Sequence, residues 1–136
     1  MNPMDNEISS CAAKANFALQ VLGDSMEPEF GNGAVIIIDP NLPALDGAYV
    51  VADLNGDVFF RQYREEGEKR YLVALKEGYP KLLINETYRL RGVVVQQARS
   101  RRRGLPKARH YATDGSRVDS PAATAAPVGG GGYPAV

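Results

Sequence analysis

The sequence has few of the residues that mark secreted, metal-binding or membrane proteins. It contains one cysteine, one histidine and no tryptophan, so an internal disulfide and a zinc-type Cys/His cluster are both excluded. No unbroken apolar run exceeds five residues, which excludes a transmembrane helix. Residues 1–7 carry acids and no base, unlike a secretory signal. We expect a cytoplasmic protein with no metal, no cofactor and no membrane partner.

The remaining composition is that of one globular domain. The chain has 136 residues, 44% of them hydrophobic and 24% charged, which is enough to bury one core. Its net charge of zero is unevenly distributed: residues 1–57 hold nine acids and one base, whereas residues 58–136 hold seven acids and fifteen bases. Such a chain can attract its own copies or a polyanion, and the charge alone does not separate the two.

Composition divides the chain into four segments. Residues 1–15 are small and polar and predict a flexible arm, and residues 16–98 predict the folded domain. Residues 99–111 form a basic segment, and residues 112–136 are rich in Ala, Gly and Pro. Because that last segment has little large apolar surface to offset its ordering entropy, we expect it to be a disordered tail.

The pattern inside the domain is mostly β. Short apolar segments separated by turn residues predict a compact domain of twisted antiparallel sheets, with strands at 17–22, 34–39, 48–54, 57–63, 71–75 and 88–97. Asn55-Gly56 suits a type I′ hairpin turn, and residues 64–70 suggest a wider charged turn. One short helical turn is expected at 25–30.

Ser25 stands where the first strand gives way to that helical turn. A serine there projects its hydroxyl out of the sheet, and the backbone N–H groups of Ser25 and Met26 are placed to stabilise an oxyanion. Asp24, with Glu27 three residues later, equally suits a capping box that leaves Ser25 as an ordinary first-turn residue. Spacing alone favours the cap.

The wider sequence adds a family resemblance. The segment FALQVLGDSMEP at 17–28, followed by an apolar strand and Asp39-Pro40, resembles the LexA-like serine peptidase family, which includes SOS repressors, CI-type phage repressors and UmuD-like proteins. The similarity covers residues 16–98. It implies a Ser–Lys dyad, in which Ser25 attacks a backbone carbonyl and a neutral lysine on the second hairpin strand takes its proton.

The resemblance also implies partners. Family members cut their own chain after contact with a recombinase filament, so a partner repressor or such a filament is expected. A two-fold homodimer through the last strand is expected as well, with Phe59, Phe60 and Tyr63 offering apolar contact surface.

The sequence departs from the family pattern at the general base. Arg61 stands where the lysine is expected, and a guanidinium stays protonated and cannot accept the proton of Ser25. Lys76, before the Tyr79-Pro80 turn, is the alternative base. His110 lies in the predicted basic segment and is interpreted as a solvated residue without a role.

Three functions therefore stay open. The first is a dimerising or regulatory LexA-like module with a degenerate dyad. The second is an active serine peptidase that uses Lys76 or cuts another chain in trans. The third is a nucleic-acid-associated regulator that binds phosphates through its basic segment, at Arg99, Arg101, Arg102 and Arg103.

Overall fold

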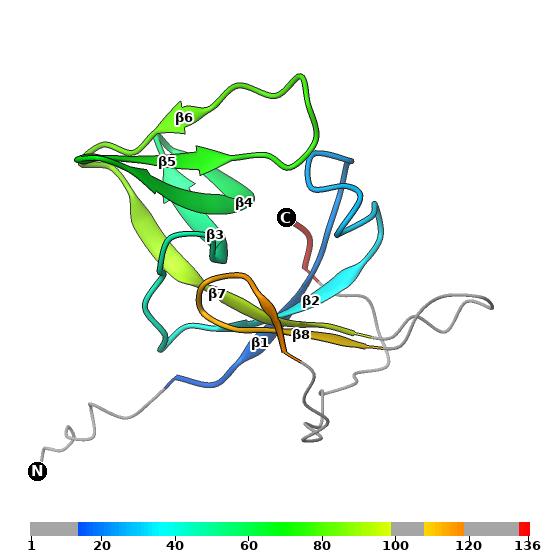
Figure 1. Ribbon diagram of the computed structural model, residues 1–136. Coiled ribbons are helices and arrows are strands. Elements are labelled where there is room, and N and C mark those ends of the chain that lie inside the picture. The colour runs from blue at the N-terminus through cyan, green and yellow to red at the C-terminus, as the bar shows by residue number, and fades with distance from the viewer. Residues whose placement is uncertain (1–13, 99–107, 119–133) are drawn as a thin grey trace, which may run out of the picture.

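The computed structural model describes residues 14–98, 108–118 and 134–136. These residues form a nine-stranded sheet (Figure 1), which confirms the mostly β prediction. None of them forms a helix that is long and apolar enough to cross a membrane. The strands are β1 (Phe17–Gln20), β2 (Val35–Asp39), β3 (Tyr49–Leu54), β4 (Asp57–Glu66), β5 (Lys69–Val73), β6 (Leu82–Leu83), β7 (Arg89–Gln97), β8 (Arg109–Tyr111) and β9 (Arg117–Val118).

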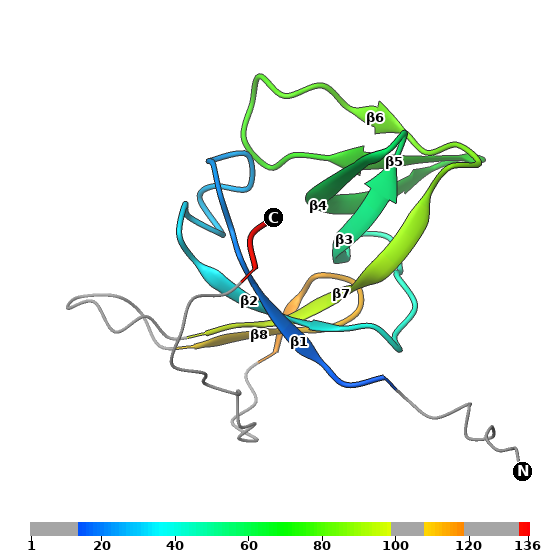
Figure 2. The ribbon, with the colours of Figure 1, turned by 180° about the vertical axis from the view of Figure 1, so that it is seen from behind.

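Strand β7 joins two halves of the sheet. The order is β1-β2-β7-β3-β4-β5-β6, with antiparallel pairing between all neighbours. The first part of β7 pairs with β3 and its second part with β2, while β8 pairs with its end. Gly92 lies at the crossing point, where a Cβ atom would approach Ile38 Cγ2 to 2.4 Å. The missing side chain therefore allows β2 to pass close to β7, and the sheet curves as both views show (Figures 1 and 2).

The sheet separates two hydrophobic clusters. Side chains alternate along β3, so that Val51 contributes to the first cluster while Val50 and Ala52 contribute to the second. The three isoleucines of β2 are all buried, as expected for an apolar strand covered on both faces. The first cluster comprises Val21, Met26, Phe30, Ile36, Ile38, Val51, Phe60, Val94 and Tyr111.

The two hairpins differ in how well the sequence predicted them. Asn55 and Gly56 both have positive φ angles, 53° and 88°, which a type I′ turn requires, so this prediction is confirmed. The second hairpin is tighter than predicted, because β4 extends to Glu66 and β5 begins at Lys69. Gly67 adopts a φ of 64°, which lets the chain reverse within two residues, and the charged residues around it pair across the strands.

The folded domain does not end at residue 98, so the predicted boundary is wrong. Strand β8 pairs with β7, β9 pairs with β8, and the Tyr111 side chain is buried in the first cluster. In the turn between β8 and β9, Gly115 packs so tightly that a Cβ atom would lie 2.0 Å from the Gly47 carbonyl oxygen. Residues 108–118 are therefore part of the domain and not a tail. Residues 1–13, 99–107 and 119–133 lie outside the described residues.

The apolar surface predicted for a homodimer is largely core. Phe60 and Tyr63 are each only 4% exposed, and Phe59 packs against the second cluster. The physical reason is that both faces of β4 are covered, because Phe60 packs in the first cluster while Phe59 and Tyr63 pack in the second. Strand β7, the predicted dimer strand, pairs with β2, β3 and β8. Phe60 and Tyr63 therefore offer little free apolar surface, and the homodimer stays a prediction.

Candidate active site around Ser25

Ser25 lies in a turn that two buried side chains anchor. The Glu27 N–H donates to the Asp24 carbonyl at 3.1 Å, and the Phe30 N–H donates to the Met26 carbonyl at 2.9 Å. Met26 and Phe30 are fully buried in the first cluster. Residues 25–30 thus form hydrogen-bonded turns and not the expected helical turn. These turns hold the partly buried Ser25 at the edge of the core.

A second loop is fastened to the backbone of Ser25. The N–H groups of Leu75 and Lys76 both donate to the Ser25 carbonyl oxygen, each at 3.0 Å. Leu75 also packs against the first hydrophobic cluster. The chain that follows β5 is therefore held next to the serine turn, although about fifty residues separate the two in sequence.

Strand β4 places Arg61 against the serine hydroxyl. Arg61 Nη1 donates a hydrogen bond to Ser25 Oγ at 3.0 Å and another to the Phe60 carbonyl at 2.9 Å. Arg61 is opposite Val50 in the β3–β4 hairpin. The structure thus brings together the two residues that the family resemblance paired, 36 positions apart in sequence.

The Arg61 guanidinium is partly buried and lies next to two aromatic rings. Its central carbon lies 5.3 Å from the centre of the Phe59 ring and 5.6 Å from that of Tyr79, within the range of cation–π attraction. Its Nε atom is buried and has no partner among the residues that the structure describes. Burial lowers the pKa of Arg61, but a guanidinium remains a hydrogen-bond donor under physiological conditions.

Asp24 does not act as the predicted cap. Its carboxylate forms an ion pair with Lys76 Nζ at 2.5 Å and accepts a hydrogen bond from the Tyr79 hydroxyl. The hydrogen bonds from Lys76 and Tyr79 lower the pKa of Asp24, and the bond to Asp24 raises the pKa of Lys76. Lys76 is thus next to the serine loop but is paired with a carboxylate, while its backbone contacts Ser25.

The oxyanion role of the serine turn stays a prediction. The Ser25 carbonyl accepts hydrogen bonds from the loop after β5, and the Met26 carbonyl accepts one from Phe30 in the same turn. Within the part of the chain that the structure describes, the N–H groups of these two residues have no protein acceptor. That leaves two adjacent donors beside the Ser25 hydroxyl, which is the chemistry an oxyanion site needs.

Comparison with known proteins identifies the family. Residues 3–95 match the family described as peptidase S24-like. This chain belongs to that family. The match covers more than half of the chain and confirms the resemblance to LexA-like peptidases, including the segment that holds Ser25 and Arg61.

The S24-like chain is also similar to several regulators. It is 41% identical over 97 residues to an HTH-type transcriptional regulator for conjugative element R391 of Providencia rettgeri, covering 66% of this chain and 45% of the relative. It is 36% identical over 90 residues to the prophage repressor CohE of Escherichia coli, covering 63% and 40%. It is 34% identical over 86 residues to repressor protein C2 of Salmonella phage P22, covering 59% and 40%. The chain spans less than half the length of these relatives.

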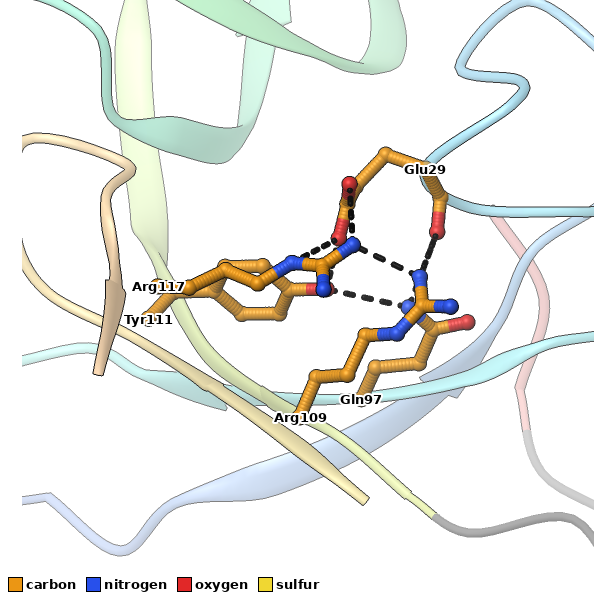
Figure 3. A network of polar contacts seen from close by, with 5 residues as sticks. All are labelled: Glu29, Gln97, Arg109, Tyr111 and Arg117. Atoms are coloured by element: carbon orange, nitrogen blue, oxygen red, sulfur yellow. Dashed lines mark hydrogen bonds and ion pairs between the residues drawn. The ribbon is translucent and has the colours of Figure 1, made fainter. Parts of the chain in front are cut away.

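A polar network joins the serine turn of the S24-like domain to β8 and β9 (Figure 3). The Glu29 carboxylate accepts hydrogen bonds from the Tyr111 hydroxyl at 2.7 Å, from Arg109 Nη1 at 3.2 Å and from Arg117 Nε and Nη2 at 3.1 and 2.9 Å. Gln97 donates to the Glu29 carbonyl and to the Tyr111 hydroxyl, each at 3.0 Å. This network fixes the β8–β9 hairpin to the far end of the turn that carries Ser25.

The network determines the charge of Glu29. Burial alone would raise the pKa of the Glu29 carboxyl, but hydrogen bonds from Arg117 and Tyr111 outweigh it and lower that pKa. Burial and the hydrogen bond to Glu29 raise the pKa of Tyr111. The network therefore holds an ionised carboxylate and a neutral phenol under physiological conditions.

The sequence did not predict this network, and some of the predicted site residues lie outside the described residues. Arg109 and Tyr111 fall inside the segment that composition marks as basic, in which no local pattern predicts packing. His110, interpreted as solvated, lies in β8 with its Nε2 atom buried. The candidate nucleic-acid residues Arg99, Arg101, Arg102 and Arg103 lie outside the described residues. Within the described ranges, no group of three or more acidic, His or Cys residues could hold a metal.

Proposed function

We propose that this S24-like domain is a regulatory module with a degenerate dyad, which keeps the serine but performs no peptidase chemistry. The observation that carries the proposal is the 3.0 Å hydrogen bond from Arg61 Nη1 to Ser25 Oγ. The group that meets the serine hydroxyl is a donor, where an acceptor is needed.

The chemical reason lies in the first step of acyl transfer. As Ser25 Oγ attacks a carbonyl carbon, its proton must pass to a nearby base. Arg61 occupies that position, and its guanidinium is fully protonated and does not lose a proton in proteins, so it has no site to accept the proton of Ser25. Its hydrogen bond also engages a lone pair of the hydroxyl oxygen that would otherwise attack. The expected outcome is a serine that stays neutral and unreactive.

The competing hypothesis, an active peptidase with Lys76 as base, has less support from the geometry. Lys76 Nζ is 2.5 Å from an Asp24 carboxylate oxygen, and that contact raises the pKa of Lys76. To accept a proton from Ser25, the ammonium would have to leave this ion pair and lose a proton. Both steps oppose catalysis near neutral pH.

A regulatory role is supported by the names of the relatives, which describe transcriptional regulators and repressors. We propose that the domain acts by association, as the LexA-like resemblance implies, with a second copy, with a partner repressor or with a recombinase filament. Sedimentation equilibrium of the purified chain tests self-association, and a monomer at tens of micromolar would contradict that part of the proposal.

The dyad is tested with an activity-based probe. A fluorophosphonate labels only serines whose proton is removed during attack, so the natural chain is expected to stay unlabelled from pH 7 to pH 10. Arg61→Lys places an amine at the base position and is expected to gain labelling as the pH rises and the amine becomes neutral. Intact mass and peptide mapping locate the label.

Two control variants make the result specific. Arg61→Lys combined with Ser25→Ala should lose all labelling gained, and Arg61→Met, of similar length but without a base, should gain none. Labelling of the natural chain at Ser25, or cleavage of a Ser25→Ala chain added in trans, would contradict the proposal. Circular dichroism confirms that each variant is folded.

A further inference from the structure

The outer edge of β1 carries an added segment of chain. Strand β1 is the end strand of the sheet order, so its outer side is available for pairing. Residues 134–136 lie along it: the Gln20 N–H donates to the Pro134 carbonyl at 2.7 Å, the Val136 N–H to the Gln20 carbonyl at 2.8 Å, and the Leu22 N–H to a Val136 oxygen at 2.9 Å. Gln20 and Ala135 form a parallel bridge. Two backbone groups of Gln20, and one of Leu22 just beyond the end of β1, are thus satisfied by a distant segment.

The added segment also makes an apolar contact. Val136 packs, partly buried, against the first hydrophobic cluster, which Leu75 of the loop next to Ser25 also contacts. Both ribbon views place residues 134–136 beside the chain that leaves β1 for the serine turn (Figures 1 and 2). The site therefore combines a row of backbone donors and acceptors with a place for one medium-sized apolar side chain.

The direction of the segment leads toward the serine. Because its pairing with β1 is parallel, residues 134–136 run the same way as β1, and Val136 lies beside Leu22, three residues before Ser25. Any extended chain bound in the same manner would approach the serine turn with its carboxyl-terminal side. The segment 134–136 thus occupies the approach to Ser25 along this edge.

We propose that the outer edge of β1 is a peptide-docking strand, and that residues 134–136 fill it from within the same chain as a displaceable plug. Addition of a strand to an exposed sheet edge is a general mode of peptide recognition, in which backbone bonds provide affinity and alternate side chains provide selectivity. Three backbone bonds and one apolar contact hold a free peptide only weakly. Attachment to the same chain compensates, because docking of the segment is then an intramolecular step.

The chemistry of the edge defines what can replace the plug. The competing partner is an extended segment of another protein, with free backbone groups at the positions of Pro134 and Val136 and an apolar side chain at the latter. Ser25 takes no part in this binding, so the proposal does not depend on whether the dyad is active. Performing the test in a Ser25→Ala background separates the two.

The test uses the chain without residues 134–136 and a labelled peptide of residues 129–136. Amide hydrogen exchange in the full chain is expected to be slow at Gln20 and Leu22, and deletion of the plug should speed it at least tenfold at both. NMR titration with the peptide should then shift these two amides in the shortened chain, with at least tenfold tighter binding than in the full chain.

N-methylated peptides provide a matched control. Methylation of the Val136 nitrogen removes the N–H that donates to Gln20, whereas methylation of the Ala135 nitrogen leaves the three bonds of the docked segment in place. The first peptide should lose binding at least tenfold relative to the second. Equal binding of the two peptides would overturn the proposal.

Other outcomes also decide it. Fast exchange at Gln20 and Leu22 in the full chain would mean that the plug is not docked, and equal peptide affinity for the full and shortened chains would mean that it blocks nothing. If the shortened chain does not fold, the full chain with Val136→Pro, which lacks the same donor, replaces it in both measurements. Unchanged exchange at Gln20 in that variant would overturn the proposal.

Discussion

Replacing Glu29 with glutamine tests whether charge holds the β8–β9 hairpin on the serine turn. The substitution keeps the size of the side chain and one acceptor oxygen, but it removes the charge that Arg109 and Arg117 face. The Glu29 side chain is 19% exposed, and those of Arg109 and Arg117 are 24% and 57% exposed. The network is thus neither fully buried nor a surface pair.

These exposures set the expected size of the effect. Exposed ion pairs contribute about 0.2–1 kcal/mol, and breaking a fully buried pair from one side costs about 3–5 kcal/mol. With Arg117 more than half exposed and Arg109 mostly covered, we expect Glu29→Gln to lower the free energy of unfolding by about 2 kcal/mol. For a domain of this size that corresponds to a fall in Tm of roughly 7 °C.

The stability difference between the natural chain and Glu29→Gln should also depend on pH, and it should decrease as the pH falls. The folded-state pKa of Glu29 lies below its ordinary value of 4.5, so its contribution is fully present above about pH 4.5 and is lost as the pH falls through the folded-state pKa. Urea unfolding of the natural chain and of Glu29→Gln at several pH values between 7 and 3 measures this. The difference between the two curves should shrink toward zero at the acid end.

Glu27→Gln is the matched control, because Glu27 lies in the same turn and makes no ion pair within the described residues. It should change the free energy of unfolding by less than about 0.5 kcal/mol. If Glu29→Gln is as mild as this control at pH 7, or if its effect is the same at pH 3, the reasoning about the network is refuted.

Two further predictions concern the segment that follows β7. Gly115→Ala places a Cβ atom 2.0 Å from the Gly47 carbonyl oxygen at a φ of 84°, so chemical denaturation should show a free energy of unfolding lower by more than about 2 kcal/mol. The control Gly67→Ala, with a positive φ but open space around it, should lose about 1 kcal/mol. Equal losses would contradict tight docking of the β8–β9 hairpin. Binding of phosphates by the basic segment predicts that affinity for duplex DNA in gel shifts falls with salt. The slope of log affinity against log salt should decrease in magnitude by about 3 to 4 when Arg99, Arg101, Arg102 and Arg103 are replaced by serine. An unchanged slope would contradict that role.

Local patterns predicted the central strands, because each carries its own signal. The isoleucine-rich strand β2 and the Asn55-Gly56 turn need no distant information to be recognised. The turn around Gly67 is present, but its predicted extent of 64–70 was too wide, because charge suggested a loop where the side chains lie on exposed positions of paired strands. Strand β8 has three residues, which is too short for an alternation to appear in the sequence.

The candidate site divides in the same way. The family resemblance paired Ser25 with Arg61, and the hydrogen bond between them follows from the β3–β4 hairpin. The capping role of Asp24 was a local inference that a tertiary contact overrode, since Lys76 and Tyr79 reach its carboxylate from a loop some fifty residues away. The Glu29 network required the position of β8 and β9, which no local pattern in the sequence supplies.

The type I′ turn at Asn55-Gly56 has a consequence for chemistry as well as for folding. It sets the register in which Val50 is opposite Arg61, and successive residues of a strand face opposite sides of the sheet. One residue inserted into this turn would shift the register by one position and turn Arg61 away from Ser25. The β4 side chains that now pack in one hydrophobic cluster would then face the other. This two-residue turn therefore determines which side chain of β4 contacts Ser25.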